Sequence, residues 1–129
     1  MNRSYDNNFR MSSEVLSGTD IISFQHDNDD LLTSAGSLTL TRNPQNGLIT
    51  GTTLGNVTDS FAYNSFGEMT SFSASFGGLN IYNTQYTRDN LGRITQKTET
   101  IGGATDTFNY SYDSAGRLSE VRKNGTVIS

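Results

Sequence analysis

The chain has 129 residues and a formal net charge of −4, which leaves room for one domain of ordinary size. Only 33% of its residues are hydrophobic and its mean hydropathy is −0.51, so no window approaches the roughly 18 apolar residues that a membrane-spanning helix needs. Charged residues make up only 17% of the chain, which argues against a coiled coil or a highly charged disordered tail.

Charge distribution and cysteine content narrow the functional classes further. The nine Lys and Arg residues are scattered singly, so no basic stripe exists to neutralise nucleic-acid phosphates or an anionic membrane surface. We therefore expect no nucleic-acid partner and no membrane span. The chain has no cysteine, which excludes disulfides, thiolate nucleophiles and cysteine zinc sites. Residues 1–6 contain no apolar stretch, so we predict no signal peptide in this chain.

The rest of the composition favours short β-strands and turns. Ser and Thr together number 33, and there are 13 Asn and 13 Gly residues. Hydroxyl residues are tolerated in strands, whereas Asn and Gly are typical of turns. The composition therefore predicts an all-β chain with many short strands.

A short motif recurs along the chain in the same phase. In chain order, loose copies occupy residues 5–11, 24–32 and 41–49, and close copies occupy residues 61–69, 86–94 and 110–118. We predict a single array of about six copies over residues 1–129, with 1–50 degenerate and 51–129 well matched. The position of the motif glycine falls at residues 9, 30, 47, 67, 92 and 116. An apolar residue follows each of these positions two places later.

Each copy predicts a β-hairpin. Aromatic residues at alternate positions, such as Tyr110 and Tyr112, place two rings on one face of a strand. The Asp or Asn that follows starts a turn by bonding the backbone two residues ahead. Gly three places later suits the left-handed position of a type I turn closed by a G1 bulge. The residues that we assign to these structural turns are Asp27, Asn64, Gly67, Asp89, Gly92, Asp113 and Gly116.

Turn signals also join each hairpin to the next. The strongest is Asn124-Gly125, because Asn before Gly is favoured in two-residue hairpin turns. The other joints are Gly18, Gly36, Gly55-Asn56, Gly77-Gly78 and Gly102-Gly103. The whole pattern predicts a meander of roughly ten to twelve antiparallel strands in a single curved or spiralling sheet, with little helix.

Two copies depart from the motif in ways that matter for their turns. Phe9 stands where glycine is expected, and its β-carbon disfavours left-handed backbone, so we expect a different or frayed turn there. Asp30 also replaces glycine, but Asp tolerates this region. Pro44 stands where the turn-starting residue is expected, and its fixed φ predicts a reset register in that hairpin.

The phrase Y-x-Y-D-x-x-G-R-L at residues 110–118 resembles the YD repeat of the rearrangement hotspot (RHS) family. That family includes wall-associated proteins, the shell-forming C components of ABC toxin complexes, and teneurins. The resemblance covers nearly the whole chain and is most specific over residues 61–129. It implies hairpins that coil into a continuous sheet around a hollow shell, which holds a C-terminal toxin in the bacterial members.

By this resemblance, the chain is a non-catalytic structural segment of a shell that encapsulates or presents a C-terminal toxin or effector, without a cofactor. We expect it to be secreted or at the cell surface as part of a larger bacterial protein. Its expected partners are neighbouring YD repeats or a second chain that pairs with a sheet edge. Nothing matches the family's DP-rich self-cleavage segment, since the only proline is Pro44. The chain is then an internal fragment, an excised segment or a small orphan array.

The aromatic residues leave a second function open. Rings on a sheet face suit the faces of pyranose sugars, as in a carbohydrate-binding adhesin. The candidate stacking residues are Phe61, Tyr63, Tyr110 and Tyr112. We favour the alternative that these rings pack across strands, for a few tenths to about 1 kcal/mol each.

The sequence offers little for catalysis or metal binding. His26 is the only histidine, and no G-x-S-x-G motif accompanies it. Asp89 and Asp113 are the candidates for a glycosidase pair, but both already have a role in turns. The acidic run at residues 26–30 lacks the ligand order of an EF-hand, so we predict a solvated turn and no metal site.

Overall fold

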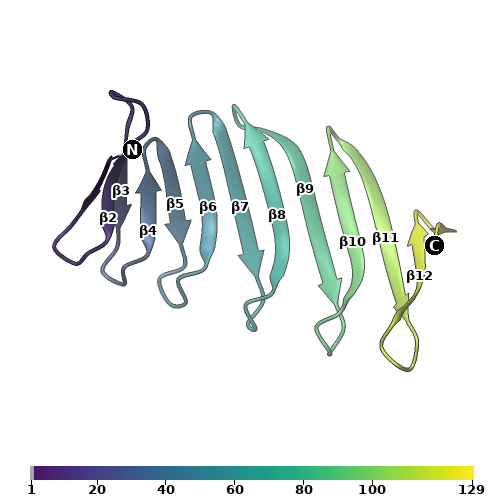
Figure 1. Cartoon of the computed structure of the whole chain (residues 1–129). Coiled ribbons are helices and arrows are strands. Elements are labelled where there is room, and N and C mark those ends of the chain that lie inside the picture. Colours follow the sequence, from purple (N-terminus) through teal and green to yellow (C-terminus); the bar gives the residue numbers. More distant parts are fainter. Residues whose placement is uncertain (1) are drawn as a thin grey trace. The chain divides into compact units, whose positions relative to one another are not determined.

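The computed structural model describes residues 2–129, and these residues form thirteen β-strands and no helix (Figure 1). Strands that are neighbours in the sheet are also neighbours in the sequence, so that β1 and β13 are the two edge strands. Each strand pairing that is described is antiparallel. The prediction of an all-β antiparallel meander is therefore confirmed.

The chain divides into two compact units, Met1–Thr58 and Asp59–Ser129. The first unit contains β1 (Asn2–Tyr5), β2 (Met11–Val15), β3 (Ile21–His26), β4 (Leu32–Ala35), β5 (Leu38–Arg42) and β6 (Ile49–Leu54). Strand β7 (Val57–Tyr63) begins at the end of the first unit and continues into the second. The second unit also contains β8 (Met69–Phe76), β9 (Leu79–Arg88), β10 (Ile94–Ile101), β11 (Ala104–Tyr112), β12 (Leu118–Lys123) and β13 (Thr126–Val127).

The motif residues form the turn at one end of each hairpin. In the turn at Asp89, the N–H of Gly92 donates to Asp89 O at 3.0 Å and the N–H of Asp89 donates to Arg93 O at 2.9 Å. The same two backbone bonds close the turns that start at Asp6, Asp27, Asn64 and Asp113. In these five turns the residue at the glycine position has a φ between +61° and +79°. This geometry is a type I turn followed by a G1 bulge.

A second bulge, separate from the G1 bulge of the turn, falls at the same position in five hairpins. Arg88 pairs with Ile94 and Thr87 pairs with Gln96, so that Thr95 is left out of the ladder. The residues skipped in this way are Ser12, Thr33, Thr50, Thr95 and Ser119. All of them carry a small hydroxyl side chain, which can serve backbone groups that the bulge leaves without a ladder partner. Thr95 Oγ1 does so by donating to Thr87 O at 3.3 Å.

The first hairpin corrects one expectation. Phe9 adopts the same turn as the glycine copies, with a φ of +61° and a 3.0 Å bond from its N–H to Asp6 O. The different turn expected at Phe9 is therefore wrong. The backbone and Asp6 side-chain bonds of this turn outweigh the strain, which costs roughly 1–2 kcal/mol for a residue with a β-carbon.

The third hairpin corrects another expectation. Asn43, rather than Pro44, starts the turn, because the N–H of Gly47 donates to Asn43 O at 2.8 Å. The turn holds one residue more than the other copies, yet Arg42 still pairs with Ile49 as in the common register. The predicted register reset is wrong because the loop accommodates the additional residue.

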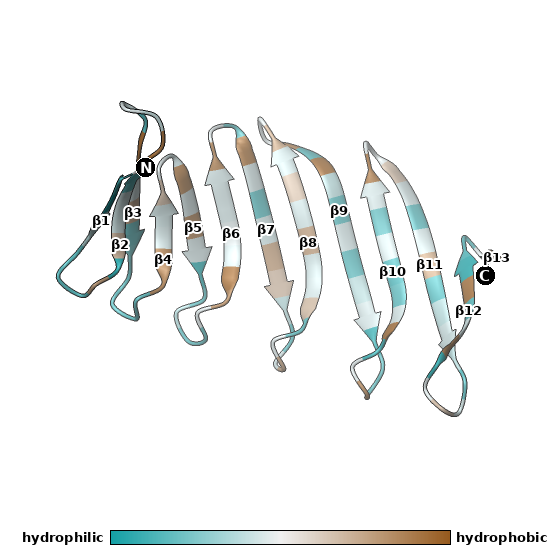
Figure 2. Ribbon diagram, in the orientation of Figure 1, coloured by the Kyte–Doolittle hydropathy of each residue, from teal (hydrophilic) through white to brown (hydrophobic). Residues whose placement is uncertain are grey.

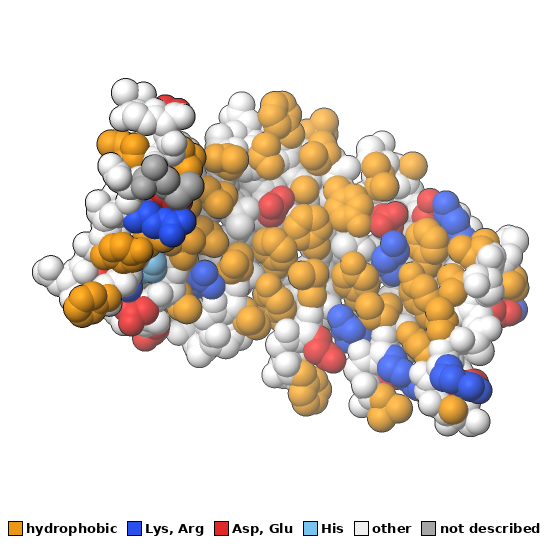
Figure 3. Space-filling model, viewed as in Figure 1, with side chains coloured by type: hydrophobic (Ala, Val, Ile, Leu, Met, Phe, Trp, Pro, Cys, Tyr) orange, Lys and Arg blue, Asp and Glu red, His pale blue; other side chains and the backbone are white. Residues whose placement is uncertain are grey.

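The strands of the second unit have two chemically different faces, which follow from their alternation of side chains. One face, here called the aromatic face, carries Phe61, Phe72, Tyr82, Tyr86, Phe108, Tyr110 and Tyr112. The opposite face of β9–β11 carries uncharged polar pairs such as Thr98 with Thr107. Figure 2 shows this alternation as changing bands of hydropathy along the ribbons. Figure 3 shows hydrophobic side chains gathered over β8–β11 on the face in view.

No hydrophobic side chain among residues 2–129 is fully buried, and Thr84 is the one polar residue that is, at 2% exposure. Half-buried aromatic rings pack against one another instead of forming an enclosed hydrophobic core. The ring centre of Phe72 lies 5.0 Å from that of Phe61 and 5.8 Å from that of Tyr82. A single sheet layer cannot enclose its own apolar face, so stability depends on contacts between neighbouring hairpins, as in other repeat proteins.

Candidate functional site

The carboxylate of each turn aspartate organises its end of the hairpin. Asp89 Oδ1 accepts hydrogen bonds from the N–H of Leu91 at 2.9 Å and of Arg93 at 3.0 Å. Asp89 Oδ2 accepts a third bond from Arg93 Nε at 2.8 Å. The same three bonds occur in the turns of Asp6 with Arg10 and of Asp113 with Arg117. The arginine after the motif glycine therefore pairs with the aspartate of its own turn.

These bonds favour the ionised carboxylate. The pKa of Asp113 lies below its ordinary value of 3.8, because the N–H of Arg117 and then its guanidinium donate to the carboxylate. At Asp89, partial desolvation acts to raise the pKa, but the bonds from Arg93 outweigh it and the pKa is also lowered. A general acid needs the opposite shift. The two carboxylates are thus suited to holding turns rather than to donating protons.

Successive turns contact each other through the residue after the motif glycine. A β-carbon at Gly92 would lie 2.5 Å from Glu68 Oε1, which comes from the preceding motif turn. In the same way, Leu31 Cδ1 lies against Gly47 and Arg93 Nη1 lies against Gly116. The glycine therefore serves two purposes: it adopts a positive φ, and it leaves room for the side chain of the preceding turn.

Asp30 replaces the motif glycine and makes the equivalent contact by charge. Arg10 Nη1, from the preceding turn, lies 2.7 Å from Asp30 Oδ1. Arg10 Nη1 also donates to Asp27 O at 3.3 Å. Left-handed backbone is tolerable for aspartate, and here the side chain gains an ion pair to the neighbouring turn.

A second link between hairpins comes from the residue just before each turn. Tyr112 OH donates to Ile94 O at 2.7 Å, in the preceding hairpin. Arginine makes the corresponding bond in two other hairpins, from Arg88 Nη2 to Met69 O at 3.2 Å and from Arg42 Nε to Leu32 O at 3.0 Å. Each accepting carbonyl belongs to the apolar residue two places after a motif glycine. The side chain just before each of these turns therefore donates a hydrogen bond to a backbone carbonyl of the preceding hairpin.

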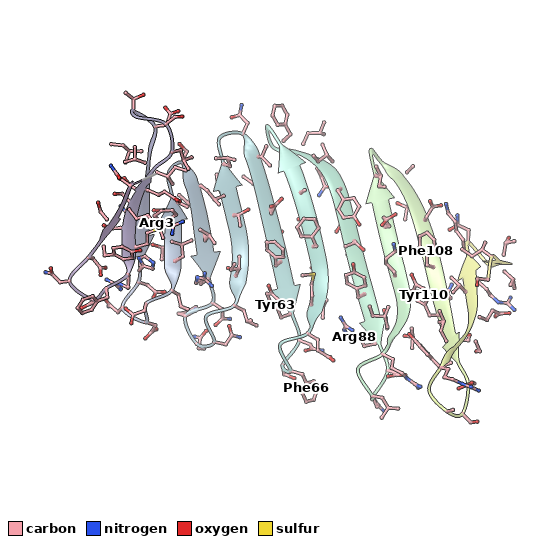
Figure 4. The ribbon with its side chains drawn as sticks, viewed as in Figure 1. Arg3, Tyr63, Phe66, Arg88, Phe108 and Tyr110 are labelled. Carbon is pink, nitrogen blue, oxygen red and sulfur yellow. The ribbon has the colours of Figure 1, made fainter. Side chains whose placement is uncertain are left out.

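Two grooves with similar linings open between successive turns, one in each unit. The groove of the second unit has a volume of about 520 Å³, and its lining includes Phe66, Glu68, Arg88 and Leu91. Arg88 Nε is buried there without a hydrogen bond, 4.0 Å from Glu68 Oε2. Figure 4 shows Phe66 at the tip of the β7–β8 turn and Arg88 near the end of β9.

The groove of the first unit lies between the turns at residues 27–30 and 43–47, with a volume of about 560 Å³. Its lining includes Leu31, Arg42 and Pro44. Arg42 holds the place that Arg88 holds in the other groove, and it donates to Gly47 O at 2.9 Å as Arg88 does to Gly92 O at 3.0 Å. The groove between turns is therefore a recurring feature of the repeat.

A third depression lies on the aromatic face and contains part of the predicted sugar-stacking set. Its volume is about 260 Å³ and its lining residues are Tyr86, Ile94, Tyr110, Tyr112 and Leu118. The guanidinium carbon of Arg93 lies 4.6 Å from the ring centre of Tyr112. We call this depression the tyrosine pocket. Tyr86 was missed as a site residue, although it has the same position in its copy of the motif as Tyr110.

The other two stacking candidates, Phe61 and Tyr63, lie outside the tyrosine pocket. The Phe61 ring packs against Phe72, with ring centres 5.0 Å apart. Figure 4 places Tyr63 at the end of β7, away from Tyr110 on β11. The structure therefore separates the four candidates into at least two groups.

The charged side chains Lys97 and Glu99 on the aromatic face form an ion pair with each other. Glu99 Oε2 accepts bonds from Lys97 Nζ at 3.0 Å and from Tyr82 OH at 2.9 Å. The bond to Glu99 raises the pKa of Lys97 and of Tyr82, and the bond from Lys97 lowers the pKa of Glu99. Lys97 Nζ also lies 4.5 Å from the ring centre of Phe108, a favourable cation–π distance.

The candidates for catalysis belong to three different hairpins. His26 is half-buried at the end of β3 and pairs with Leu32. Asp89 and Asp113 belong to different turns, and each is held by its own arginine. Within residues 2–129, no group of three His, Cys, Asp or Glu side chains is arranged to hold a metal ion. The same part of the chain has no helix that is long and apolar enough to cross a membrane.

The repeated turn, with its aspartate, glycine and arginine, is the feature through which the sequence resembles the YD repeat. The family model described as Teneurin YD-shell matches residues 1–128. The chain belongs to the teneurin YD-shell family. This confirms the membership of the YD-repeat family that the sequence indicated. No curated protein matches the chain.

Membership places this YD-shell chain among structural shell-type modules rather than in a known enzyme family. Members are extracellular or secreted parts of larger proteins. In this YD-shell chain the turn stack and the grooves between turns are the features that repeat, whereas the tyrosine pocket occurs once among the described depressions. The repeated features are therefore the architectural part of the molecule.

Proposed function

We propose that this chain is a non-catalytic wall segment of a shell, which encapsulates or presents a C-terminal effector in a larger bacterial protein that is secreted or at the cell surface. The observation that supports this role is the link between successive hairpins. Arg88 bonds Met69 O and Tyr112 bonds Ile94 O, each in the preceding hairpin. Such links let hairpins be added side by side without a closed core. The partners of the segment are then neighbouring YD repeats.

The wall role predicts that stability grows with the number of hairpins. In a repeat array, every added neighbour contributes an interface to the same cooperative unit. We expect two copies of the chain joined head to tail to unfold in urea with a higher midpoint and a steeper slope than one copy. A tandem protein with the midpoint of the single chain would contradict the wall role, because the two copies would then behave as independent domains.

The enclosure of an effector is tested on the larger protein. We expect electron microscopy of the polypeptide that contains this chain to reveal hollow particles, and limited proteolysis to spare its C-terminal segment. A C-terminal segment cleaved as fast as a free peptide would contradict encapsulation while leaving the wall role intact.

The tyrosine pocket favours one alternative, a carbohydrate-binding adhesin-like surface module. Three tyrosine rings around an apolar floor of Ile94 and Leu118 offer stacking surfaces for a sugar ring. If this function operates, binding on a glycan array should be lost in Tyr86→Ala and Tyr110→Ala. Tyr5→Ala is the matched control, because Tyr5 is an exposed tyrosine on β1, outside the pocket. The absence of glycan binding by the folded wild-type chain would remove the alternative.

A further inference from the structure

Two of the three motif turns in the second unit carry a large apolar side chain at the tip, whereas the third carries Ala115. Phe66 is 87% exposed and Leu91 is 77% exposed. Both occupy the third position of a type I turn, where almost any residue is accepted. Phe66 and Leu91 line the same groove and so form one apolar patch, and such patches mark interaction surfaces.

The groove between these two turns complements the tips. Phe66 and Leu91 line its rim, and the 520 Å³ between them is ample for an aromatic side chain. The buried Nε of Arg88 has no hydrogen-bond partner, and the face of an entering ring would lie favourably against its guanidinium. One groove thus lies between two protruding tips, so a tip of a second copy can enter the groove of the first.

The charges of this edge also suit a second copy of the same surface. The acidic side chains Glu68, Asp89 and Asp113 each have an arginine within ion-pair distance, at 4.0, 2.8 and 2.9 Å. The edge is thus locally neutral, although the whole chain carries a net charge of −4. Two identical edges can approach without strong like-charge repulsion.

We propose that the turn edge of the second unit, formed by the turns at residues 64–67 and 89–92, binds the same edge of a second copy. In this arrangement Phe66 of each copy enters the groove between Phe66 and Leu91 of the other, around a two-fold axis. The contact differs from pairing between edge strands, because it uses side chains at the turns rather than free backbone groups of β1 or β13. It does not depend on the proposed wall role.

Analytical ultracentrifugation of the whole chain tests this contact. The interface is smaller than the roughly 800 Å² per partner of a standard complex, so the measurement extends to about 500 µM protein. We expect a reversible dimer that is weakened about 30-fold or more by the double substitution Phe66→Ser with Leu91→Ser, since removal of a central anchor usually has such an effect. The control is Phe76→Ser with Leu79→Ser, which removes two exposed apolar residues from the opposite end of the hairpins and should leave the dimer unchanged.

Three results would overturn the proposal: a wild-type chain that stays monomeric throughout, a dimer that survives the Phe66 and Leu91 substitutions, or equal weakening by the control. The second result would point to pairing between edge strands. Cross-linking gives a separate measurement that does not rely on the double variant. Because the chain has no cysteine, a single Phe66→Cys substitution should yield a disulfide-linked dimer under mild oxidation. Phe76→Cys should not, and equal cross-linking of both would contradict the proposal.

Discussion

Asn64 Nδ2 donates a hydrogen bond to Glu68 Oε2 across 2.7 Å, which reverses the polarity of the bond between Asp89 Oδ2 and Arg93 Nε in the next motif turn. In both turns, Oδ1 of the first residue accepts from the backbone N–H groups two and four residues later. The first position of the turn and the position four residues later can therefore carry an amide with a carboxylate, as in Asn64 and Glu68, or a carboxylate with a guanidinium, as in Asp89 and Arg93. The turn at Asp27 closes with the same backbone bonds although the position four residues later is Leu31, so the side-chain bond adds to a turn that the backbone already forms.

Asn64→Asp should destabilise the chain by about 1 kcal/mol at pH 7, because it replaces the bond to Glu68 by two carboxylates that face each other. Glu68→Gln added to Asn64→Asp should restore most of the loss, since the Gln amide can donate to the new carboxylate. Urea unfolding of the two single variants and the double variant measures the coupling. Additive effects would show that residues 64 and 68 do not interact in solution.

The contribution of Asp113 to stability should disappear in acid. Its folded pKa lies below the ordinary value of 3.8, so its contribution is complete above pH 3.8 and is lost as the pH falls through the folded value. Asp113→Asn should lower the melting temperature at pH 7, and the gap to the wild type should close towards pH 2. Thermal melts from pH 7 to pH 2 check this. Asp29→Asn, outside any described ion pair, is the control at pH 7, where its melting temperature should match that of the wild type.

Gly92→Ala should cost more than the same substitution at Gly18. Both glycines have a positive φ, for which alanine pays roughly 1–2 kcal/mol. At Gly92 the new methyl group would also meet Glu68 Oε1 at 2.5 Å, whereas Gly18 has nothing within 4 Å. Removing the obstacle with Glu68→Ala should reduce the cost of Gly92→Ala to that of Gly18→Ala. Equal costs at both glycines in the wild-type background would argue against contact between successive turns.

Tyr112→Phe should destabilise the chain by about 1 kcal/mol, because it removes the bond from the hydroxyl to Ile94 O and leaves that carbonyl without its partner. Tyr110→Phe is the matched control, since the Tyr110 hydroxyl has no hydrogen bond within residues 2–129 and the ring stays in place. Chemical denaturation of the two variants gives the comparison. A loss in Tyr110→Phe as large as in Tyr112→Phe would contradict the link between hairpins.

Phe9→Gly should stabilise the chain by about 0.5–1 kcal/mol. Phe9 is 90% exposed and has a φ of +61°, so glycine relieves left-handed strain without loss of packing, less the entropy cost of glycine. Asp30→Gly relieves similar strain but removes the ion pair with Arg10, so its gain should be smaller. Thermal melts rank the two variants, and a lower melting temperature for Phe9→Gly would show that its ring is in contact in solution.

Much of the fold could be predicted from the sequence because turn chemistry is local. Asp or Asn followed by Gly three places later favours one turn type through bonds within a few residues, and strands alternate faces whatever surrounds them. For that reason the meander was recognisable from the copies at residues 61–69, 86–94 and 110–118. Two local expectations failed. At Phe9 the hydrogen bonds of the hairpin outweigh the preference of one residue, and at Pro44 the loop accommodates one more residue without a change of register.

The sequence by itself determined the all-β meander, the phase of its turns and the family, since all three are carried by short-range patterns. Only the tertiary structure decided which side chains meet between hairpins. Glu68 contacts Gly92, Tyr112 bonds Ile94 O, and Tyr86 and Tyr110 line one pocket, all between residues 18 or more positions apart. Such meetings depend on the register of neighbouring strands and on where adjacent hairpins separate. The motif residues of one copy do not set these contacts by themselves, because the contacts form only when one hairpin packs against the next.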